Sequence, residues 1–210
     1  MDDNIDNVAA LFTRSDGAYV FARWGCPIVP VVFGVDDATL AVFKGAIEAV
    51  VALANHTIDE TDMALSGANL MVFFCRDWAE LRAVPHLDQL VPDLGPLVDK
   101  LQAAGANQYR IFRFDPAGGI KAAFVFLRMD AHLETVAADT LALSQAVQTI
   151  VLWSDTAFDA KAPLAMISGH AVLRPEIADV VRAAYDPVMP SAARDASHAL
   201  RLAARITRPS

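Results

Sequence analysis

The side chains that could do chemistry include a short run, Asp130-x-His132-x-Glu134, at the end of a predicted strand. Carboxylate oxygens and imidazole nitrogens bind divalent metal ions, and alternate positions can present them together. One hypothesis is therefore a metal-dependent hydrolase with a rearranged ligand set. That set would be Asp130, His132, Asp155 and His170. The alternative interpretation of the run is a solvated start of a helix.

Motifs of other chemistries are missing from the sequence. The five histidines include no His-x-x-x-His pair, which excludes a zinc site built on one helix. Residues 115–119 have turn composition but no following lysine or helix, so a hairpin turn is favoured over a phosphate loop. Ser168-Gly169-His170 has no nucleophile elbow around it. Cys26 and Cys75 lie in separate predicted strands without a neighbouring histidine, which favours two buried thiols and leaves a disulfide open.

A polar face is predicted on a long helix that runs from about residue 134 to residue 153. Ser144 and Gln148 are four residues apart and share one side of this helix. A hydroxyl group and a neutral amide are poor zinc ligands, and Gln145 cannot act as a general base. We therefore expect no catalytic residue, no bound metal and no cofactor here. Two interpretations remain open: these residues line a cleft, or they are only the polar side of an amphipathic helix.

The same segment resembles the active-site helix of zinc metallopeptidases of the zincin class, with each functional position replaced. When this segment is aligned with the motif His-Glu-x-x-His-x-x-Gly-x-x-His, the motif's functional positions correspond to Ser144, Gln145, Gln148, Val151 and Ser154. Further along, Ala165-Met166-Ile167 resembles the methionine turn beneath a metzincin site. Residues 173–187 resemble the closing helix.

A closer resemblance is to a proteobacterial family of unknown function within the zincin clan, several members of which are described as lipoproteins. Its helix runs approximately Glu-Glu-x-x-Gln-x-Leu-Gly-Leu-x-Asn-Asp and is followed by a Leu-Tyr-Asp-Pro segment. The positions that match are Arg23-Trp24, Pro27-Ile28, Ala68-Asn69-Leu70, Gln148, Leu152, Asp155 and Tyr185-Asp186-Pro187. The resemblance covers about residues 20–195. The chain departs from the family at Ser144 and Gln145, where the family has carboxylates.

The resemblance implies a catalytically inactive zincin-like domain that binds a peptide or glycan, or acts as an interaction module of the cell envelope. The expected cleft residues are Ser144, Gln145, Gln148, Ser154 and Asp155, with His170 as a neighbour. The expected partners are an extended peptide, a glycan or an envelope protein. If the strand beside the cleft has a free edge, a peptide could add to it, as substrates do in zincins. The resemblance implies the periplasm or the envelope, whereas the first ten residues lack a secretory signal and imply the cytoplasm if that terminus is native.

The elements that would position these residues follow from hydrophobic spacing. Apolar residues from Leu40 to Ala54 recur every three or four positions, which predicts a helix that either Asp36 or Asp37 can cap. Strands are predicted over 18–24, 28–33 and 68–75, and a hairpin over 109–129. After the long helix we expect a loop over 155–173 and helices over 175–185 and 192–206. This order predicts an α+β (mixed α/β) domain with a mixed sheet. The resemblance to the zincin clan implies that the sheet is twisted, with a backing helix, the former active-site helix and C-terminal helices.

The composition bounds the class of protein. The 210 residues, 55% of them apolar, predict a polar lead over 1–16 and one domain over 17–210. A net charge of -8 without a basic block argues against nucleic acid as a partner. The most apolar stretch contains Lys44 and Glu48 and is too short for a membrane span. A third hypothesis, a structural role in an envelope assembly, predicts an exposed apolar patch with Phe12, Trp24 and Trp78 as its candidates.

Overall fold

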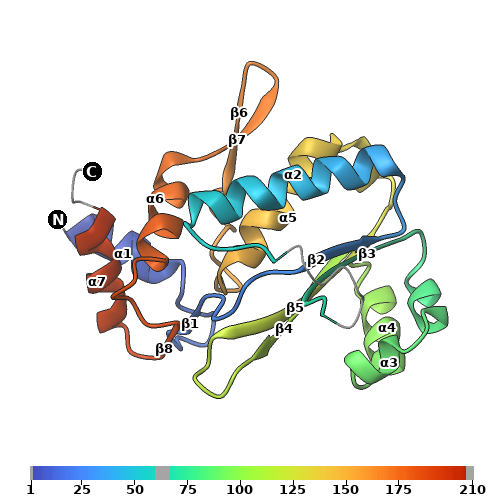
Figure 1. The fold of residues 1–210 in the computed structure, drawn as a ribbon, viewed down its shortest axis with the longest axis horizontal. Helices are drawn as coiled ribbons and strands as arrows, with labels where there is room; N and C mark the ends of the chain where they lie inside the picture. The colour runs from blue at the N-terminus through green and yellow to red at the C-terminus, as the bar shows by residue number, and fades with distance from the viewer. Residues whose placement is uncertain (1, 60–66, 207–210) are drawn as a thin grey trace.

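The fold is built around a four-stranded mixed sheet. The computed structural model describes residues 2–59 and 67–206. The strand order is β2 (Pro30–Phe33), β3 (Leu70–Cys75), β5 (Ile120–Arg128) and β4 (Gln108–Phe114). The first three run parallel, and β4 runs antiparallel to β5 at one edge of the sheet (Figure 1). The chain is thus an α+β domain with a mixed sheet, as predicted from its sequence.

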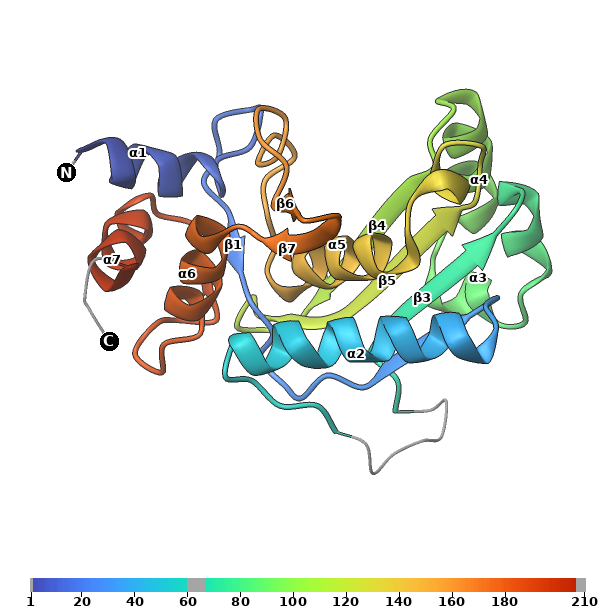
Figure 2. The same cartoon turned by 90° about the horizontal axis from the view of Figure 1, so that it is seen from above.

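Two long helices, α2 (Asp37–Leu53) and α5 (Ala138–Ile150), pack against each other over one face of the sheet (Figure 2). The N-cap of α2 is Asp36, whose Oδ1 accepts a hydrogen bond from the amide of Thr39 at 2.7 Å. Its buried stripe is Phe43, Ile47, Val50 and Val51. Capping and a three-to-four spacing of apolar residues explain why this helix was predictable. Gly34 ends β2 with φ +83°, and an added Cβ would lie 2.5 Å from the carbonyl oxygen of Phe74.

The opposite face of the sheet is covered by η1 (Trp78–Ala83), α3 (Leu87–Leu90) and α4 (Leu94–Ala103). Met71, Phe73 and Cys75 of β3 pack into this second core, whereas Leu70 and Val72 pack toward α2 and α5. A strand covered on both faces needs apolar side chains at nearly every position. The continuous apolar run of β3 has this cause.

A third group of helices lies beside the sheet and contains α1 (Asp2–Ala10), α6 (Pro175–Ala184) and α7 (Ser197–Ile206). Two short strands, β1 (Phe21–Ala22) and β8 (Ala192–Ala193), pair beneath it. Val8 and Phe12, within the segment 1–16 that was expected as a polar lead, are buried in the main core. Phe12, Trp24 and Trp78 are all buried, and the patch expected from them is not exposed.

Three predicted elements differ in the structure. The long helix expected over 134–153 is shorter, because η2 (Leu133–Thr135) precedes α5 and the chain is extended from Val151. The loop expected over 155–173 contains a hairpin of β6 (Leu164–Ile167) and β7 (His170–Leu173), which turns through Ser168 and Gly169 at positive φ. The last helix begins five residues later than expected, after β8. Residues 60–66 of the predicted loop after α2 lie outside the described residues.

Candidate functional site

A cleft of about 630 Å³ lies between the edge strand β4 and the carboxyl end of α5. One wall is β4, and the other is the end of α5 with the extended chain that follows it. Residues of three kinds line it: cations, acidic or neutral polar side chains, and aromatic or apolar side chains. They are Arg14, Gln108, Tyr109, Arg110, Phe112, Gln148, Leu152, Trp153, Ser154, Asp155, Phe158 and Asp159.

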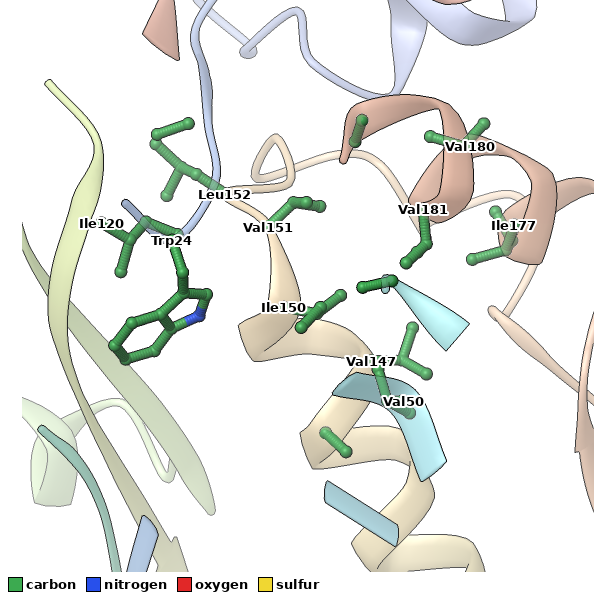
Figure 3. Packing of buried hydrophobic residues seen from close by; sticks show 14 of the residues in the cluster. Trp24, Val50, Ile120, Val147, Ile150, Val151, Leu152, Ile177, Val180 and Val181 are labelled. Atoms are coloured by element: carbon green, nitrogen blue, oxygen red, sulfur yellow. The ribbon is translucent and has the colours of Figure 1, made fainter. Parts of the chain in front are cut away.

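The carboxyl end of α5 is fixed by side-chain donors. The last carbonyl groups of a helix have no partner within the helix and need donors from elsewhere. The indole Nε1 of Trp24 donates to Thr149 O at 2.8 Å, and that of Trp153 donates to Val147 O at 2.8 Å. The Tyr185 hydroxyl donates to Ile150 O at 2.7 Å. Figure 3 shows this end of α5 with Trp24 and Ile120 on one side and Val181 of α6 on the other.

Main-chain pairing continues beyond the helix and shapes the cleft wall. The amide of Leu152 donates to Ala22 O at 2.8 Å, and that of Ser154 donates to Leu11 O at 2.9 Å. Val151 also bridges Arg23. These bonds to the N-terminal segment hold the chain extended, so α5 ends at Ile150 and Trp153 leaves the helix. The indole of Trp153 stacks on Phe12 with a centroid separation of 5.5 Å and forms an aromatic wall with Phe158.

Arg110 crosses from β4 to α5 at the floor of the cleft. Its Nη2 donates to Gln145 Oε1 at 2.7 Å and to Gln108 Oε1 at 3.1 Å, and Gln145 Nε2 donates to Gln108 Oε1 at 2.9 Å. Burial lowers the pKa of the Arg110 guanidinium to about 10, which leaves it a cation at neutral pH. Its Nε is buried with no hydrogen-bond partner. The cation is thus held by two neutral amides.

The rim of the cleft is closed by Asp155. Its carboxylate accepts hydrogen bonds from the amide of Ser15 at 2.9 Å and from the Ser15 hydroxyl group. These bonds, with a smaller contribution from the charge of Arg14, lower the pKa of Asp155. Asp155 therefore fastens the loop between α1 and β1 to the chain after α5.

The structure brings together part of the predicted cleft set. Gln148, Ser154 and Asp155 line the cleft, and Gln148 Nε2 donates to Ser144 Oγ at 2.8 Å. Gln145 is 2% exposed and lies beneath the cleft, where it holds Arg110.

His170 is not a neighbour of these residues. It is exposed at the start of β7, on the hairpin that projects from the body in Figure 1, and it is not among the lining residues. The expected methionine turn is on the same hairpin, where Met166 and Ile167 are 62% and 60% exposed. Neither residue lies beneath the cleft, because these positions pair as a hairpin strand.

The rearranged metal set Asp130, His132, Asp155 and His170 is not assembled. In residues 2–59 and 67–206, no three His, Cys, Asp or Glu side chains are grouped to hold a metal ion. Asp130 instead accepts from the amides of His132 and Leu133 at 3.1 and 2.9 Å, which lowers its pKa and starts η2. The run at 130–134 is therefore a solvated helix start.

The two cysteines are free. Asn69 Nδ2 donates to Cys26 Sγ at 3.6 Å, and His56 Nε2 is 2.9 Å from the carbonyl oxygen of Cys26. Burial raises the pKa of the Cys26 thiol and raises that of Cys75 to about 11. Both thiols are therefore protonated at neutral pH and are poor nucleophiles.

A second hollow, of about 360 Å³, lies on the other face of β4. Tyr109, Ile111 and Arg113 line it together with residues of α4, including Leu97 and Lys100. Alternate side chains of one strand point to opposite faces of the sheet. The two hollows therefore flank the same strand, one on each side.

Sequence reasoning missed the residues that β4 contributes to the cleft, among them Gln108, Arg110 and Phe112. The signal was present in the alternation of residues 108–114, which places these three side chains on one face. The alternation alone does not show which face of β4 packs against α5.

Comparison with protein-family models, with curated proteins and with solved structures finds no match to this chain. Among the described helices, none combines the length and the apolar character that crossing a bilayer requires.

Proposed function

We propose that this chain is a catalytically inactive, zincin-like domain that binds an extended peptide as an additional strand along β4. The observation that carries the proposal is the free outer edge of β4 beside the cleft. The arrangement of the helices supports the zincin-like part of the proposal: α5 follows β5 and lies across the sheet, and α2 packs against α5. The resemblance to the zincin clan favours an envelope protein as the source of the peptide.

The register of the β4–β5 ladder identifies the groups that face a ligand. The amide of Arg128 donates to Asn107 O at 2.8 Å, and bonded pairs alternate along an antiparallel ladder. The N–H and C=O groups of Gln108, Arg110 and Phe112 therefore point away from β5. Among the described residues, none of these groups bonds to another segment. A strand edge of this kind is a template for pairing with another chain.

The two hollows favour a peptide over a glycan. Side chains of a paired strand alternate between the faces of the sheet, so successive ligand residues would enter the cleft and the second hollow in turn. A glycan would use the aromatic wall of Trp153 and Phe158 and would leave the free amides of β4 unpaired.

The absence of catalysis is proposed from the chemistry of α5. The helix has no histidine, cysteine or glutamate, and Gln148, the residue of α5 that lines the cleft, is bonded to Ser144. Neither can activate a water molecule without a metal ion or a base. Peptides that bind should therefore remain intact during incubation with the protein and Zn²⁺, as followed by mass spectrometry.

The experiment that tests binding is a selection from a displayed library of random linear peptides on the immobilised chain. We expect enriched peptides to slow hydrogen exchange at the amides of Gln108, Arg110 and Phe112, while exchange at the intervening amides changes little. Peptides with N-methyl groups at alternate positions should bind in one register and fail in the other. A failure to enrich any peptide, or unchanged exchange at all three amides in a bound complex, would overturn the proposal.

A further inference from the structure

We propose that Arg110 is the receptor for an acidic side chain of the bound peptide. The cleft would then select an extended segment with aspartate or glutamate opposite Arg110 and an apolar residue two positions away. This inference rests on the proposed function and names the chemistry of the ligand.

The first support is the unmet bonding capacity of Arg110. A guanidinium group has five N–H donors, and both bonds of Arg110 use Nη2 and end on neutral amides. Within the described ranges, no carboxylate forms an ion pair with it, and its buried Nε has no partner. Arg110 is half-buried, and a charge taken out of water is costly unless it is paired. A carboxylate is the partner whose geometry fits a guanidinium. Arg82, Arg128, Arg182 and Arg205, by contrast, each pair with an aspartate of the chain.

The second support is the disposition of the other charges in the cleft. Arg14 adds a second cation to the lining and has no ion-pair partner among the described residues. Of the two carboxylates, Asp155 is engaged by Ser15, and Asp159 is exposed on the chain after α5. Both belong to the wall opposite β4. The cations and carboxylates of the lining are thus equal in number, and Arg110 is the charged lining residue that belongs to β4 itself.

The position of Arg110 within β4 favours an acidic side chain over a terminal carboxylate. The free main-chain groups of Gln108 and Phe112 extend the pairing edge on both sides of Arg110. A ligand strand that uses the whole edge continues past Arg110 in both directions, so the carboxylate belongs to a residue inside the segment. Phe112 lies two residues after Arg110 on the same face of β4 and lines the cleft with Trp153 and Phe158. We therefore expect an apolar ligand side chain opposite Phe112.

The test uses peptides enriched by the selection described above, synthesised with acetylated and amidated ends. We expect the enriched sequences to share an acidic residue with an apolar residue two positions away. Replacing the acid by its amide should weaken binding about tenfold, as measured by isothermal titration calorimetry. Arg110→Gln should cause the same loss with the unaltered peptide, and the two changes together should cost no more than either alone. Arg182→Gln, the same change on an exposed arginine of α6, should leave the affinity unchanged.

The outcomes separate this inference from the function on which it rests. Enriched peptides without an acidic residue, or an acid-to-amide change without effect, overturn the role of Arg110 and leave strand addition in place. Binding that needs a free carboxyl terminus overturns the side-chain assignment. Because the acid-to-amide comparison uses the unaltered protein, it decides the question even if Arg110→Gln does not fold.

Discussion

The hydroxyl group of Tyr185, at the end of α6, donates a hydrogen bond of 2.7 Å to the carbonyl oxygen of Ile150, the last residue of α5. It also accepts a hydrogen bond from the amide of Trp24 at 3.3 Å. One buried phenol thus joins α5, α6 and the N-terminal segment at the base of the cleft. The burial that this requires raises the pKa of Tyr185, which keeps the hydroxyl protonated.

The substitution Tyr185→Phe should destabilise the fold without changing its shape. It leaves a buried carbonyl group and a buried amide without a partner, at a cost of about 1–3 kcal/mol in the free energy of unfolding. Urea denaturation measures the loss. Tyr109→Phe is the matched control, because the Tyr109 hydroxyl group has no hydrogen-bond partner among the described residues. This control should change the free energy of unfolding by less than about 0.5 kcal/mol. Equal losses in the two variants would contradict the role of Tyr185.

Local signals made much of the fold predictable. Asp36 and the apolar spacing after it gave α2, the turn residues 115–119 gave the β4–β5 hairpin, and Pro175 suited the first turn of α6. Each of these depends on neighbours within a few positions. Sequence reasoning therefore reached the α+β class and the order of the main elements.

The end of α5 was not predictable, because distant residues decide it. Trp153 continues the apolar spacing of the helix, but the amides of Leu152 and Ser154 bond to Ala22 and Leu11, and the chain leaves the helix. The residues of the candidate site likewise include some that local sequence predicts and others that depend on distant contacts. Gln148 followed from its helix position, whereas Arg110 became part of the site only through the tertiary packing of β4 on α5.

Gln145 and Arg110 should be energetically coupled. Gln145→Leu removes an acceptor from the half-buried Arg110 and removes one of the two donors to Gln108 Oε1, so we expect a loss of about 1–3 kcal/mol in the free energy of unfolding. With Arg110→Met already present, the same change should cost less, by a coupling energy of about 0.5–3 kcal/mol. A double-mutant cycle in urea measures this difference. Gln148→Leu, which loses only its bond to Ser144, serves as the control partner for Arg110→Met and should be additive with it.

Asp155 should hold the loop around Ser15 in place. Asp155→Ala removes both acceptors, so the Ser15 amide should exchange with solvent faster than in the unaltered chain. Because the native pKa of Asp155 is lowered, its contribution to stability is present above the ordinary aspartate pKa and is lost as the pH falls through the native value. The Ser15 amide resonance should accordingly titrate below the ordinary aspartate range. Asp159→Ala, on the same rim, should leave the exchange rate of the Ser15 amide unchanged. Faster exchange of that amide in Asp159→Ala would show that the charge of the rim, and not the hydrogen bonds of Asp155, slows it.

His198 should make the stability of the fold fall in mild acid. It is 3% exposed on α7, its Nδ1 is 2.8 Å from the Tyr19 hydroxyl group, and its Nε2 has no partner. The ring of Phe21 also packs on it, with centroids 4.3 Å apart. Burial and the nearby charges of Arg201 and Arg205 lower the pKa of His198 from 6.5 to about 4. The folded state therefore holds a neutral imidazole over a range of pH in which the unfolded chain is protonated.

The sign of the pH dependence follows from this difference. A lowered pKa in the folded state gives a contribution that is complete above pH 6.5 and is lost as the pH falls to about 4. The full loss is about 3 kcal/mol, at 1.36 kcal/mol per unit of pKa. Urea unfolding of the unaltered chain and of His198→Gln at several values between these limits isolates the effect from that of the carboxylates. As the pH falls, the unaltered chain should lose more free energy of unfolding than His198→Gln does. Stability curves of His198→Gln and the unaltered chain that stay parallel would show that the imidazole is protonated as readily in the fold as in the unfolded chain.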